Sequence, residues 1–287
     1  MYTTSSEIHE VIYSPESQMR TPRLLLRSMW HDIKASRELA WRLFRRDLSA
    51  RYRQSLFGVL WAFIPIIVTS TIFIVLQSRN VVDFGEIGIP YPVYVLVGTI
   101  LWQLFVDSLN APLRSVTEAR PLLVKINFPR EALIISAFYL VLFDLLIKLV
   151  VLTAVFLFFR LDPTWGLLLA PIPILMLMLL GMAIGLLLTP FGMLYTDIAT
   201  SLPIITSLAF FITPVVYAPP TGFPFSLIAF ANPVSPALIA ARDLITTGSM
   251  TNLLPFLVIS GLTILLLLVA WLLYRVALPI IIERMSA

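Results

Sequence analysis

Long runs of apolar residues dominate the hydropathy pattern of this 287-residue chain. As helices that rise ~1.5 Å per residue, six of these runs are long enough to cross the ~30 Å hydrocarbon core of a bilayer. They cover residues 56–77, 93–112, 132–159, 166–193, 198–217 and 253–276. The composition, 59% hydrophobic and 13% charged, agrees, because a soluble core of this size cannot hide so much apolar surface. The pattern predicts an all-α integral membrane protein with six transmembrane helices.

The 20 Lys and Arg residues lie mostly on one side of the predicted spans. Ten precede the first span, four lie between spans two and three, and two, Arg275 and Arg284, close the chain, whereas only three fall in the loops of the opposite side. By the positive-inside rule we expect both termini in the cytoplasm and the protein in the cytoplasmic (inner) membrane. The pI of about 9.5 therefore points to anionic membrane lipids as partners and not to nucleic acid.

The segment directly before the first span, residues 36–57, distributes basic and apolar residues around a helix. Apolar side chains cover much of its surface, and an arc of about 100° carries four arginines: Arg42, Arg45, Arg46 and Arg53. Such a helix lies flat in the membrane interface; the alternative is a basic flank that only sets the topology. We divide the chain into a flexible cytoplasmic tail (1–30), an amphipathic interface helix (31–55), a six-span domain (56–277) and a cytoplasmic tail (278–287).

Two further features interrupt the apolar pattern. On the cytoplasmic side, residues 113–130 form a short mixed-charge loop, and residues 195–197 form a very short turn. On the opposite side, prolines and glycines in residues 218–251 separate two apolar pieces at about 225–231 and 236–246. Neither piece can span a bilayer, and a disordered loop would be more polar. We expect a re-entrant helical hairpin enclosed by protein or by a water-filled cavity.

Residues suited to catalysis or to metal binding are scarce. The chain has no cysteine, and its only histidines, His9 and His31, precede the membrane domain. No GxxxxGK[ST] phosphate loop is present, so ATP cannot bind by that route. We expect no catalytic site, no metal site and no cofactor in this chain. Any work against a gradient then needs a separate subunit that binds ATP and Mg²⁺.

Two sets of side chains within the predicted spans are candidates for a conduit. Asp144 and Lys148 lie four residues apart on one face of span three, where each unpaired charge costs about 2.5–3.5 kcal/mol. We expect an intrahelical ion pair, with a polar conduit wall as the alternative. Aromatic side chains stack on sugar rings, although aromatic belts at the membrane interfaces are the commoner reason for such residues. The aromatic candidates are Trp61, Trp102, Phe105, Tyr139, Phe211 and Tyr217.

Three segments carry a resemblance to a known family. They are RDLSARYRQSLFGVLWAFIPI (46–66), LLVKINFPREAL (122–133) and FITPVVY (211–217), the last followed by Asn232-Pro233 and by Arg242. In this order and spacing the chain resembles the ABC-2 type permeases that export polysaccharides, which include O-antigen, capsule and teichoic-acid exporters. The resemblance extends over roughly residues 35–280.

The resemblance implies a homodimer that binds two copies of a separate ABC ATPase subunit. It implies a coupling helix at about 113–124, gate helices at about 222–246 and a glycan on an undecaprenyl-diphosphate carrier as substrate. The expected contacts to the ATPase are Arg114, Glu118, Arg120, Tyr195 and Asp197. Those to the substrate diphosphate are Arg42, Arg46 and Arg53, because a guanidinium binds two phosphate oxygens at once.

Two observations qualify these expectations. Thr196 stands where the family commonly has arginine in the second cytoplasmic turn, which weakens the expected ATPase contact there. An integral membrane enzyme acting on polyprenyl-phosphate-linked sugars is the alternative function, and it needs clustered acidic or His residues at the interface. The carboxylates on the predicted extracellular side are scattered along the sequence instead. A channel or scaffold without an ATPase is a third possibility.

Overall fold

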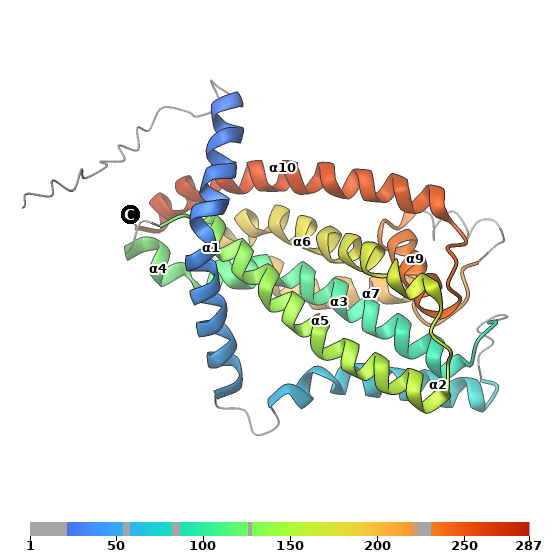
Figure 1. The fold of residues 1–287 in the computed structure, drawn as a ribbon. Coiled ribbons are helices and arrows are strands. Elements are labelled where there is room, and N and C mark those ends of the chain that lie inside the picture. Colours follow the sequence, from blue (N-terminus) through green and yellow to red (C-terminus); the bar gives the residue numbers. More distant parts are fainter. Residues whose placement is uncertain are drawn as a thin grey trace, which may run out of the picture.

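The computed structural model describes residues 22–53, 58–81, 87–125, 128–220, 222 and 231–286. Every element in these ranges is a helix (Figure 1). In chain order they are α1 (Pro22–Arg53), η2 (Gly58–Ala62), α2 (Ile64–Ser78), α3 (Tyr91–Glu118), α4 (Arg120–Lys125), α5 (Glu131–Phe159), η3 (Trp165–Leu168), α6 (Pro171–Leu194), α7 (Thr196–Ile212), α9 (Val234–Thr246) and α10 (Leu253–Ser286).

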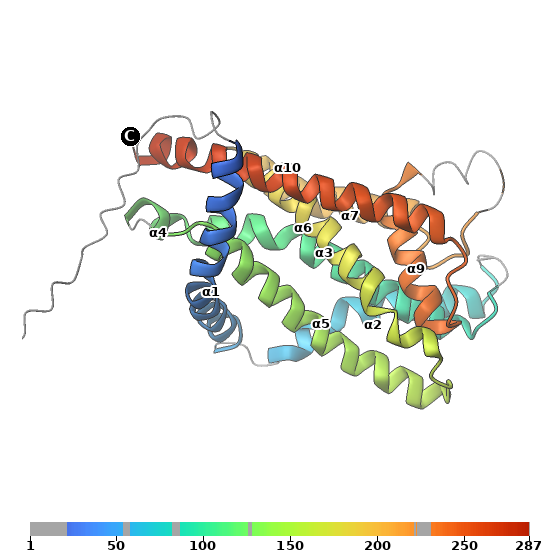
Figure 2. The same ribbon diagram turned by 45° about the horizontal axis from the view of Figure 1, so that its top comes forward.

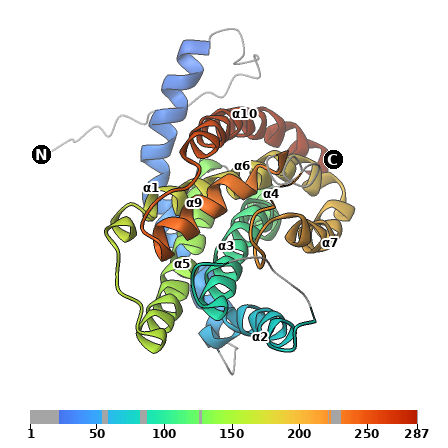
Figure 3. The same ribbon diagram turned by 90° about the vertical axis from the view of Figure 1, so that its right-hand side faces the viewer.

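The long helices form a bundle, and α1 crosses one end of it. In Figures 1 and 2, α1 runs transverse to α3, α5, α6 and α10, near the end where α4 and the C-terminus lie. The short helix α9 lies at the opposite end of the bundle, and Figure 3 views the bundle from that side. We call these the α4 end and the α9 end. The transverse course of α1 is the one expected of a helix that lies flat on a membrane.

Among the described helices, four are long and apolar enough to cross a membrane, namely α3, α5, α6 and α10. Two of the predicted spans, 56–77 and 198–217, correspond to the shorter apolar helices α2 and α7. Helix α2 starts only at Ile64, because Gly58 has a positive φ of 49° and opens a 3₁₀ turn instead. Helix α7 ends at Ile212 because Thr213 precedes Pro214, and a residue before proline avoids helical backbone.

Helices α3 and α6 pack most closely at the centre of the bundle. A Cβ atom added at Gly185 would lie 2.1 Å from the carbonyl oxygen of Leu109, and one at Gly181 would lie 2.7 Å from that of Phe105. These two glycines, four residues apart, therefore let the backbones of α3 and α6 approach each other, as small residues do in membrane helices. This packing buries most of α3.

Several boundaries differ from the sequence analysis. Helix α1 begins at Pro22, within the predicted tail, and α10 continues to Ser286, beyond the predicted end of the membrane domain. The predicted coupling segment 113–124 is split, because α3 continues to Glu118 and α4 starts afresh at Arg120. Pro121 lies in the first turn of α4, where its missing N–H is tolerated.

The predicted re-entrant hairpin is described only in part. Helix α9 corresponds to the second apolar piece, 236–246, and it is largely buried against α6 and α3. Residues 225–230 of the first piece lie outside the described residues.

Candidate functional site

A groove lies between α2, α3 and α7. It encloses about 400 Å³ and is lined by both aromatic and hydrogen-bonding side chains. Helix α3 contributes Thr99, Gln103, Val106 and Asn110, whose spacing of three or four residues places them on one helical face. From α2 the groove receives Pro65, Ile66, Thr69 and Phe73, and from α7 Pro203, Thr206, Ser207, Phe210 and Phe211.

The polar atoms of this wall are held by neighbouring groups. The Thr99 and Ser70 hydroxyl oxygens lie 2.9 Å apart. The Asn110 side-chain amide donates to the Val106 carbonyl at 2.8 Å. The Gln103 amide donates to the Asp107 carboxylate at 2.9 Å. Side chains of this kind are costly against lipid, and here they lie among aromatic and apolar side chains of the groove.

Of the six predicted conduit aromatics, two line the groove. These are Trp102 on α3 and Phe211 on α7. Phe105 is buried beside Trp102, with the ring centroids 5.5 Å apart, and so supports the wall without facing the groove. Phe210, which the sequence analysis did not select, also lines the groove and meets the Trp102 ring edge-on at 5.9 Å.

The other three aromatic candidates lie elsewhere. Tyr139 packs beneath the transverse helix α1, where its ring lies 6.1 Å from that of Trp41 and 6.0 Å from that of Phe44. Trp61 is 58% exposed on the 3₁₀ turn before α2. The Tyr217 hydroxyl donates to the backbone carbonyl of Ile212 at 3.0 Å and so closes the end of α7. The aromatic residues of this chain therefore serve several purposes.

Four charged side chains connect α1, α5 and α3. Lys148 of α5 is 1% exposed and its ammonium donates to the carboxylate of Asp107 on α3. Asp144 of α5 accepts from Nη1 of Arg51 on α1, at 2.8 Å and 3.1 Å to its two oxygens. We call Arg51, Asp144, Lys148 and Asp107 the charge network. Through Asp107 and Gln103 it reaches the helix that lines the groove.

The predicted ion pair within α5 is therefore replaced by two pairs between helices. Spacing along one helix shows only which side chains can meet on that helix. In the folded chain, Asp107 and Arg51 approach from other helices and neutralise Lys148 and Asp144 separately. Burial lowers the pKa of the Arg51 guanidinium, but the hydrogen bond and the charge of Asp144 outweigh burial, so this pKa is raised from its ordinary value.

The predicted diphosphate-binding arginines lie on the exposed surface of α1. Arg42 forms an ion pair of 2.6 Å with Glu38, one helical turn away, and Arg46 forms one of 2.7 Å with Asp47. Arg53 is exposed at the end of α1. Arg51, which was not among the predicted contacts, reaches a buried carboxylate of another helix, the Asp144 side chain of α5.

The predicted ATPase contacts gather at the α4 end. Arg114 and Glu118 form an exposed ion pair of 2.7 Å at the end of α3, and Arg120 is exposed at the start of α4. Tyr195 is 62% exposed between α6 and α7, and Asp197 is exposed in the first turn of α7. A Cβ atom at Gly192 would meet the Leu113 side chain at 2.5 Å. The turn between α3 and α4 and the turn between α6 and α7 therefore lie at the same end of the bundle.

A second cluster of polar contacts occupies the α9 end. Arg242 of α9 is 2% exposed, and its Nη1 donates to the backbone carbonyls of Pro214 at 2.9 Å and Val215 at 3.2 Å. Two tyrosines at the start of α3 extend the pattern. The Tyr91 hydroxyl donates to the Val216 carbonyl at 3.1 Å, and the Tyr94 hydroxyl donates to the Tyr217 carbonyl at 2.8 Å.

Side chains of α3 and α9 thus hold residues 213–217, which we call the 213–217 segment, by donating hydrogen bonds to its successive backbone carbonyls. The Arg242 guanidinium also lies over the Tyr94 ring, with Cζ 3.9 Å from the centroid, a cation–π contact. Gly98 leaves space for the segment, because a Cβ atom there would lie 2.1 Å from the Val215 carbonyl oxygen. From the sequence, Arg242 counted as a loop charge and as part of the family resemblance, and its contacts with the 213–217 segment were not predicted. An arginine within the apolar piece 236–246 was the available signal.

Comparisons with known proteins place this chain in a family. The ABC-2 type transporter family model matches residues 38–246, from α1 to the end of α9. An "O-antigen export system permease protein RfbA" of Myxococcus xanthus is 27% identical over 179 residues, which cover 61% of this chain and 66% of that relative. A protein of the same name from Klebsiella pneumoniae is 25% identical over 209 residues, covering 71% of this chain and 78% of the relative.

The chain thus spans just under two thirds of the Myxococcus xanthus relative. The matched range contains the groove, the charge network and the Arg242 cluster. Since the family match covers well over half of the sequence, this chain belongs to the ABC-2 type transporter family.

Proposed function

We propose that this chain is the transmembrane subunit of an ABC transporter that exports a lipid-linked polysaccharide, such as O-antigen, across the cytoplasmic membrane. ATP hydrolysis in a separate subunit supplies the energy. The observation that carries the proposal is the groove between α2, α3 and α7, which is aromatic and polar within an apolar bundle. The names of two relatives, both O-antigen export permeases, support the choice of substrate.

The chemistry of the groove suits a sugar chain. Sugar rings present apolar C–H faces, which stack on aromatic side chains such as Trp102, Phe210 and Phe211. Their hydroxyl groups exchange hydrogen bonds with amides and hydroxyls such as those of Gln103, Asn110 and Ser207. A wall that offers both kinds of contact along one helix allows a long polymer to slide without binding tightly at one point.

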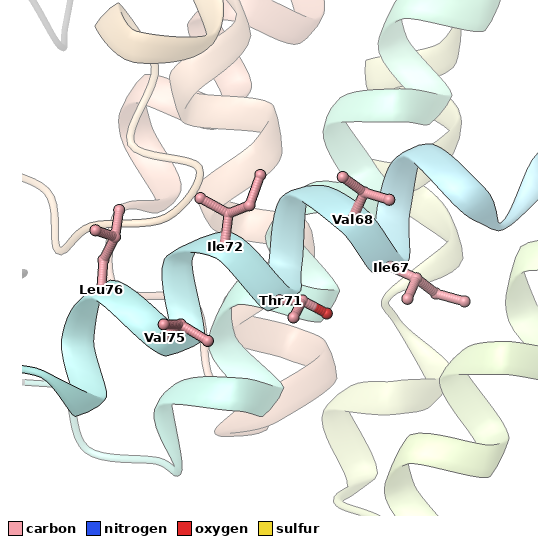
Figure 4. Close-up of a pocket in the computed structure, with 6 residues that line it drawn as sticks. All are labelled: Ile67, Val68, Thr71, Ile72, Val75 and Leu76. Carbon is pink, nitrogen blue, oxygen red and sulfur yellow. The ribbon is translucent and has the colours of Figure 1, made fainter.

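A second copy of the chain would close the groove. Polar groove side chains cannot face lipid at low cost. The neighbouring outward face of α2 carries Ile67, Val68, Ile72 and Val75, all about half exposed in one protomer (Figure 4). A homodimer that joins two α2–α7 faces buries these apolar side chains and turns two grooves into one conduit. In this arrangement α2 and α7 complete six spans, and α9 forms part of the extracellular gate.

The α4 end is then the cytoplasmic end, where the ATPase docks and the substrate enters. Two copies of the ATPase would contact α4, the Arg114–Glu118 pair and the turn at Tyr195 and Asp197. The transverse helix α1 would lie in the inner-leaflet interface, where Arg42, Arg46 and Arg53 meet the undecaprenyl diphosphate that carries the glycan.

Obstruction of the groove tests the proposed path. Asn110→Trp fills the groove, whereas Leu265→Trp adds the same ring to an exposed position of α10. With the cognate ATPase in proteoliposomes, we expect ATP-dependent delivery of lipid-linked glycan to the opposite leaflet to fall at least tenfold for the first variant only. Delivery is measured by access of a lectin to the glycan. Wild-type delivery by Asn110→Trp, at equal incorporation, would rule out the groove as the path.

The dimer has its own test. Because the chain has no cysteine, Ile72→Cys introduces a single thiol on the exposed face of α2, and Leu265→Cys places one on α10. Oxidation in native membranes should cross-link two copies through position 72 much more efficiently than through position 265. Equal cross-linking at both positions contradicts a dimer formed through α2.

A further inference from the structure

Arg51 differs from the other arginines of α1 in how it is held. Arg42 and Arg46 pair with carboxylates of their own helix on the exposed surface. Arg51 instead pairs with Asp144 of α5, whose side chain is 7% exposed. A buried carboxylate on another helix fixes the position of a guanidinium, whereas exposed pairs within one helix contribute little.

The geometry of this pair leaves one edge of the guanidinium available. Both oxygens of Asp144 accept from the same nitrogen, Nη1, at 2.8 Å and 3.1 Å. The carboxylate therefore does not use Nε and Nη2, which lie along the other edge of the planar group. The Arg51 side chain is 36% exposed. Two parallel N–H donors on one edge match two oxygens of a phosphate, an arrangement that lysine cannot reproduce.

The surroundings of Arg51 combine a cation with exposed apolar surface. Arg51 lies near the end of α1, with its Cζ 5.8 Å from the centroid of the Tyr52 ring. The next described element, η2, exposes Leu60 and Trp61 to more than half of their surface. A phosphate at Arg51 can therefore have its hydrocarbon chain against Leu60 and Trp61 of η2, which favours a phosphate that belongs to a lipid over one free in solution.

We propose that Arg51, positioned by Asp144, binds the diphosphate headgroup of a polyprenyl lipid through Nε and Nη2. The assignment rests on the proposed function for the identity of the lipid. Asp144 is a positioning residue, since it touches the guanidinium and not the ligand. Because Lys148 on the same helix pairs with Asp107, next to Gln103 of the groove wall, α5 joins the headgroup site to the conduit.

The test uses the full-length chain with its ATPase in nanodiscs of phosphatidylcholine. Undecaprenyl diphosphate is added at increasing mole fraction, and both lipid retention, by native mass spectrometry, and stimulation of ATP hydrolysis are measured. We expect Arg51→Gln to weaken lipid binding at least tenfold and Arg51→Lys to weaken it several-fold although it keeps the charge. Arg37→Gln is the matched control, because Arg37 is an exposed arginine of the same helix, and should stay within twofold of wild type.

The positioning role of Asp144 has a separate readout. In an Asp144→Leu background the guanidinium loses its anchor, so replacing Arg51 by Lys should change affinity by less than twofold. A purely structural Asp144 would leave the preference for arginine over lysine intact. Arg51→Lys retains a cation for Asp144 and so provides the test if Arg51→Gln does not fold.

Each remaining outcome decides between explanations. If Arg51→Lys binds undecaprenyl diphosphate with wild-type affinity, the site requires only a positive charge, and the proposal is overturned. Equal Arg51-dependent binding of phosphatidylglycerol, or of soluble inorganic diphosphate without the lipid, overturns the assignment to a polyprenyl diphosphate. If the wild-type complex binds undecaprenyl diphosphate through Arg51 but exports no glycan, the site holds and the proposed function fails.

Discussion

Two regions of this bundle bury a cation in different ways. Midway along α5, Lys148 is neutralised by the carboxylate of Asp107, and Asp144 beside it by Arg51. At the α9 end, Arg242 is as deeply buried as Lys148, but the groups hydrogen-bonded to its guanidinium in the described part of the chain are backbone carbonyls of the 213–217 segment. The Tyr94 ring covers one of its faces.

The difference reflects what each cation stabilises. Lys148 connects two regular helices, whose backbone groups are already paired within each helix. Its partner is therefore a side chain, and both members of the pair can be replaced by uncharged residues. Arg242 holds an extended segment that has left the helical pattern, and backbone carbonyls without partners cost several kcal/mol in a membrane protein. The Lys148–Asp107 pair is therefore replaceable, whereas the backbone carbonyls of the 213–217 segment need the donor that Arg242 supplies.

The largest effect is expected at the α9 end. Arg242→Met leaves the carbonyls of Pro214 and Val215 without their donor, and we expect it to lower the free energy of unfolding by roughly 3–5 kcal/mol. Arg242→Lys keeps one donor group and should lose less. The measurement is denaturant unfolding in detergent, followed by tryptophan fluorescence.

Arg79→Met is the control for that experiment. Arg79 is an exposed arginine at the end of α2, and its replacement should change stability by less than about 0.5 kcal/mol. Equal stability of the Arg242→Met and Arg79→Met variants would show that the 213–217 segment does not depend on Arg242.

The second effect concerns the replaceable pair. Asp107→Asn leaves Lys148 buried without its carboxylate and should cost about 2–3 kcal/mol, somewhat less than for a fully buried pair because Asp107 is partly exposed. Adding Lys148→Met should recover most of this loss, since the double variant has no unpaired charge. A double-mutant cycle measures the coupling. The same cycle between Asp144 and Lys148 should give a smaller coupling, and a larger one there contradicts the pairing between helices.

The third effect tests the close approach of α3 to the 213–217 segment at Gly98. Gly98→Ala places a Cβ atom 2.1 Å from the Val215 carbonyl oxygen, so the segment must move away from Arg242. Such overpacking costs roughly 1–2 kcal/mol. Gly261→Ala is the matched control, because no atom lies within 4 Å of the added Cβ in α10. If both variants unfold alike, the close approach of α3 to the segment has no energetic role.

Hydropathy predicted the helical class of this fold, because every long apolar run became a helix. It predicted the lengths of α2 and α7 less well. Their ends depend on the backbone of single residues, the positive φ of Gly58 and the proline after Thr213. Such local conformations depend on one or two residues, so the average hydropathy of a span does not reveal them.

The sequence predicted several residues of the site correctly, but it did not predict which of them contact each other. The sequence located the charges of span three, and Trp102 and Phe211 of the groove. It paired Asp144 with Lys148 because spacing along one helix was the only geometry it offered. Contacts between helices, such as Arg51 with Asp144 or Arg242 with the 213–217 segment, depend on tertiary packing. No periodicity within one segment contains that information.

The smallest effect is expected for the exposed pair at the α4 end, and it separates stability from coupling. Arg114 and Glu118 lie one helical turn apart and are each more than half exposed, so the pair should contribute less than about 0.5 kcal/mol. Glu118→Gln should therefore unfold like wild type, unlike either buried cluster. If this surface docks the ATPase, Glu118→Arg should still abolish most ATP-dependent export while the protein inserts and unfolds normally. Asp162→Arg is the control, because it makes the same charge reversal at an exposed position between α5 and η3. Normal export by Glu118→Arg, with ATPase bound at wild-type stoichiometry, would place the coupling surface elsewhere on the α4 end.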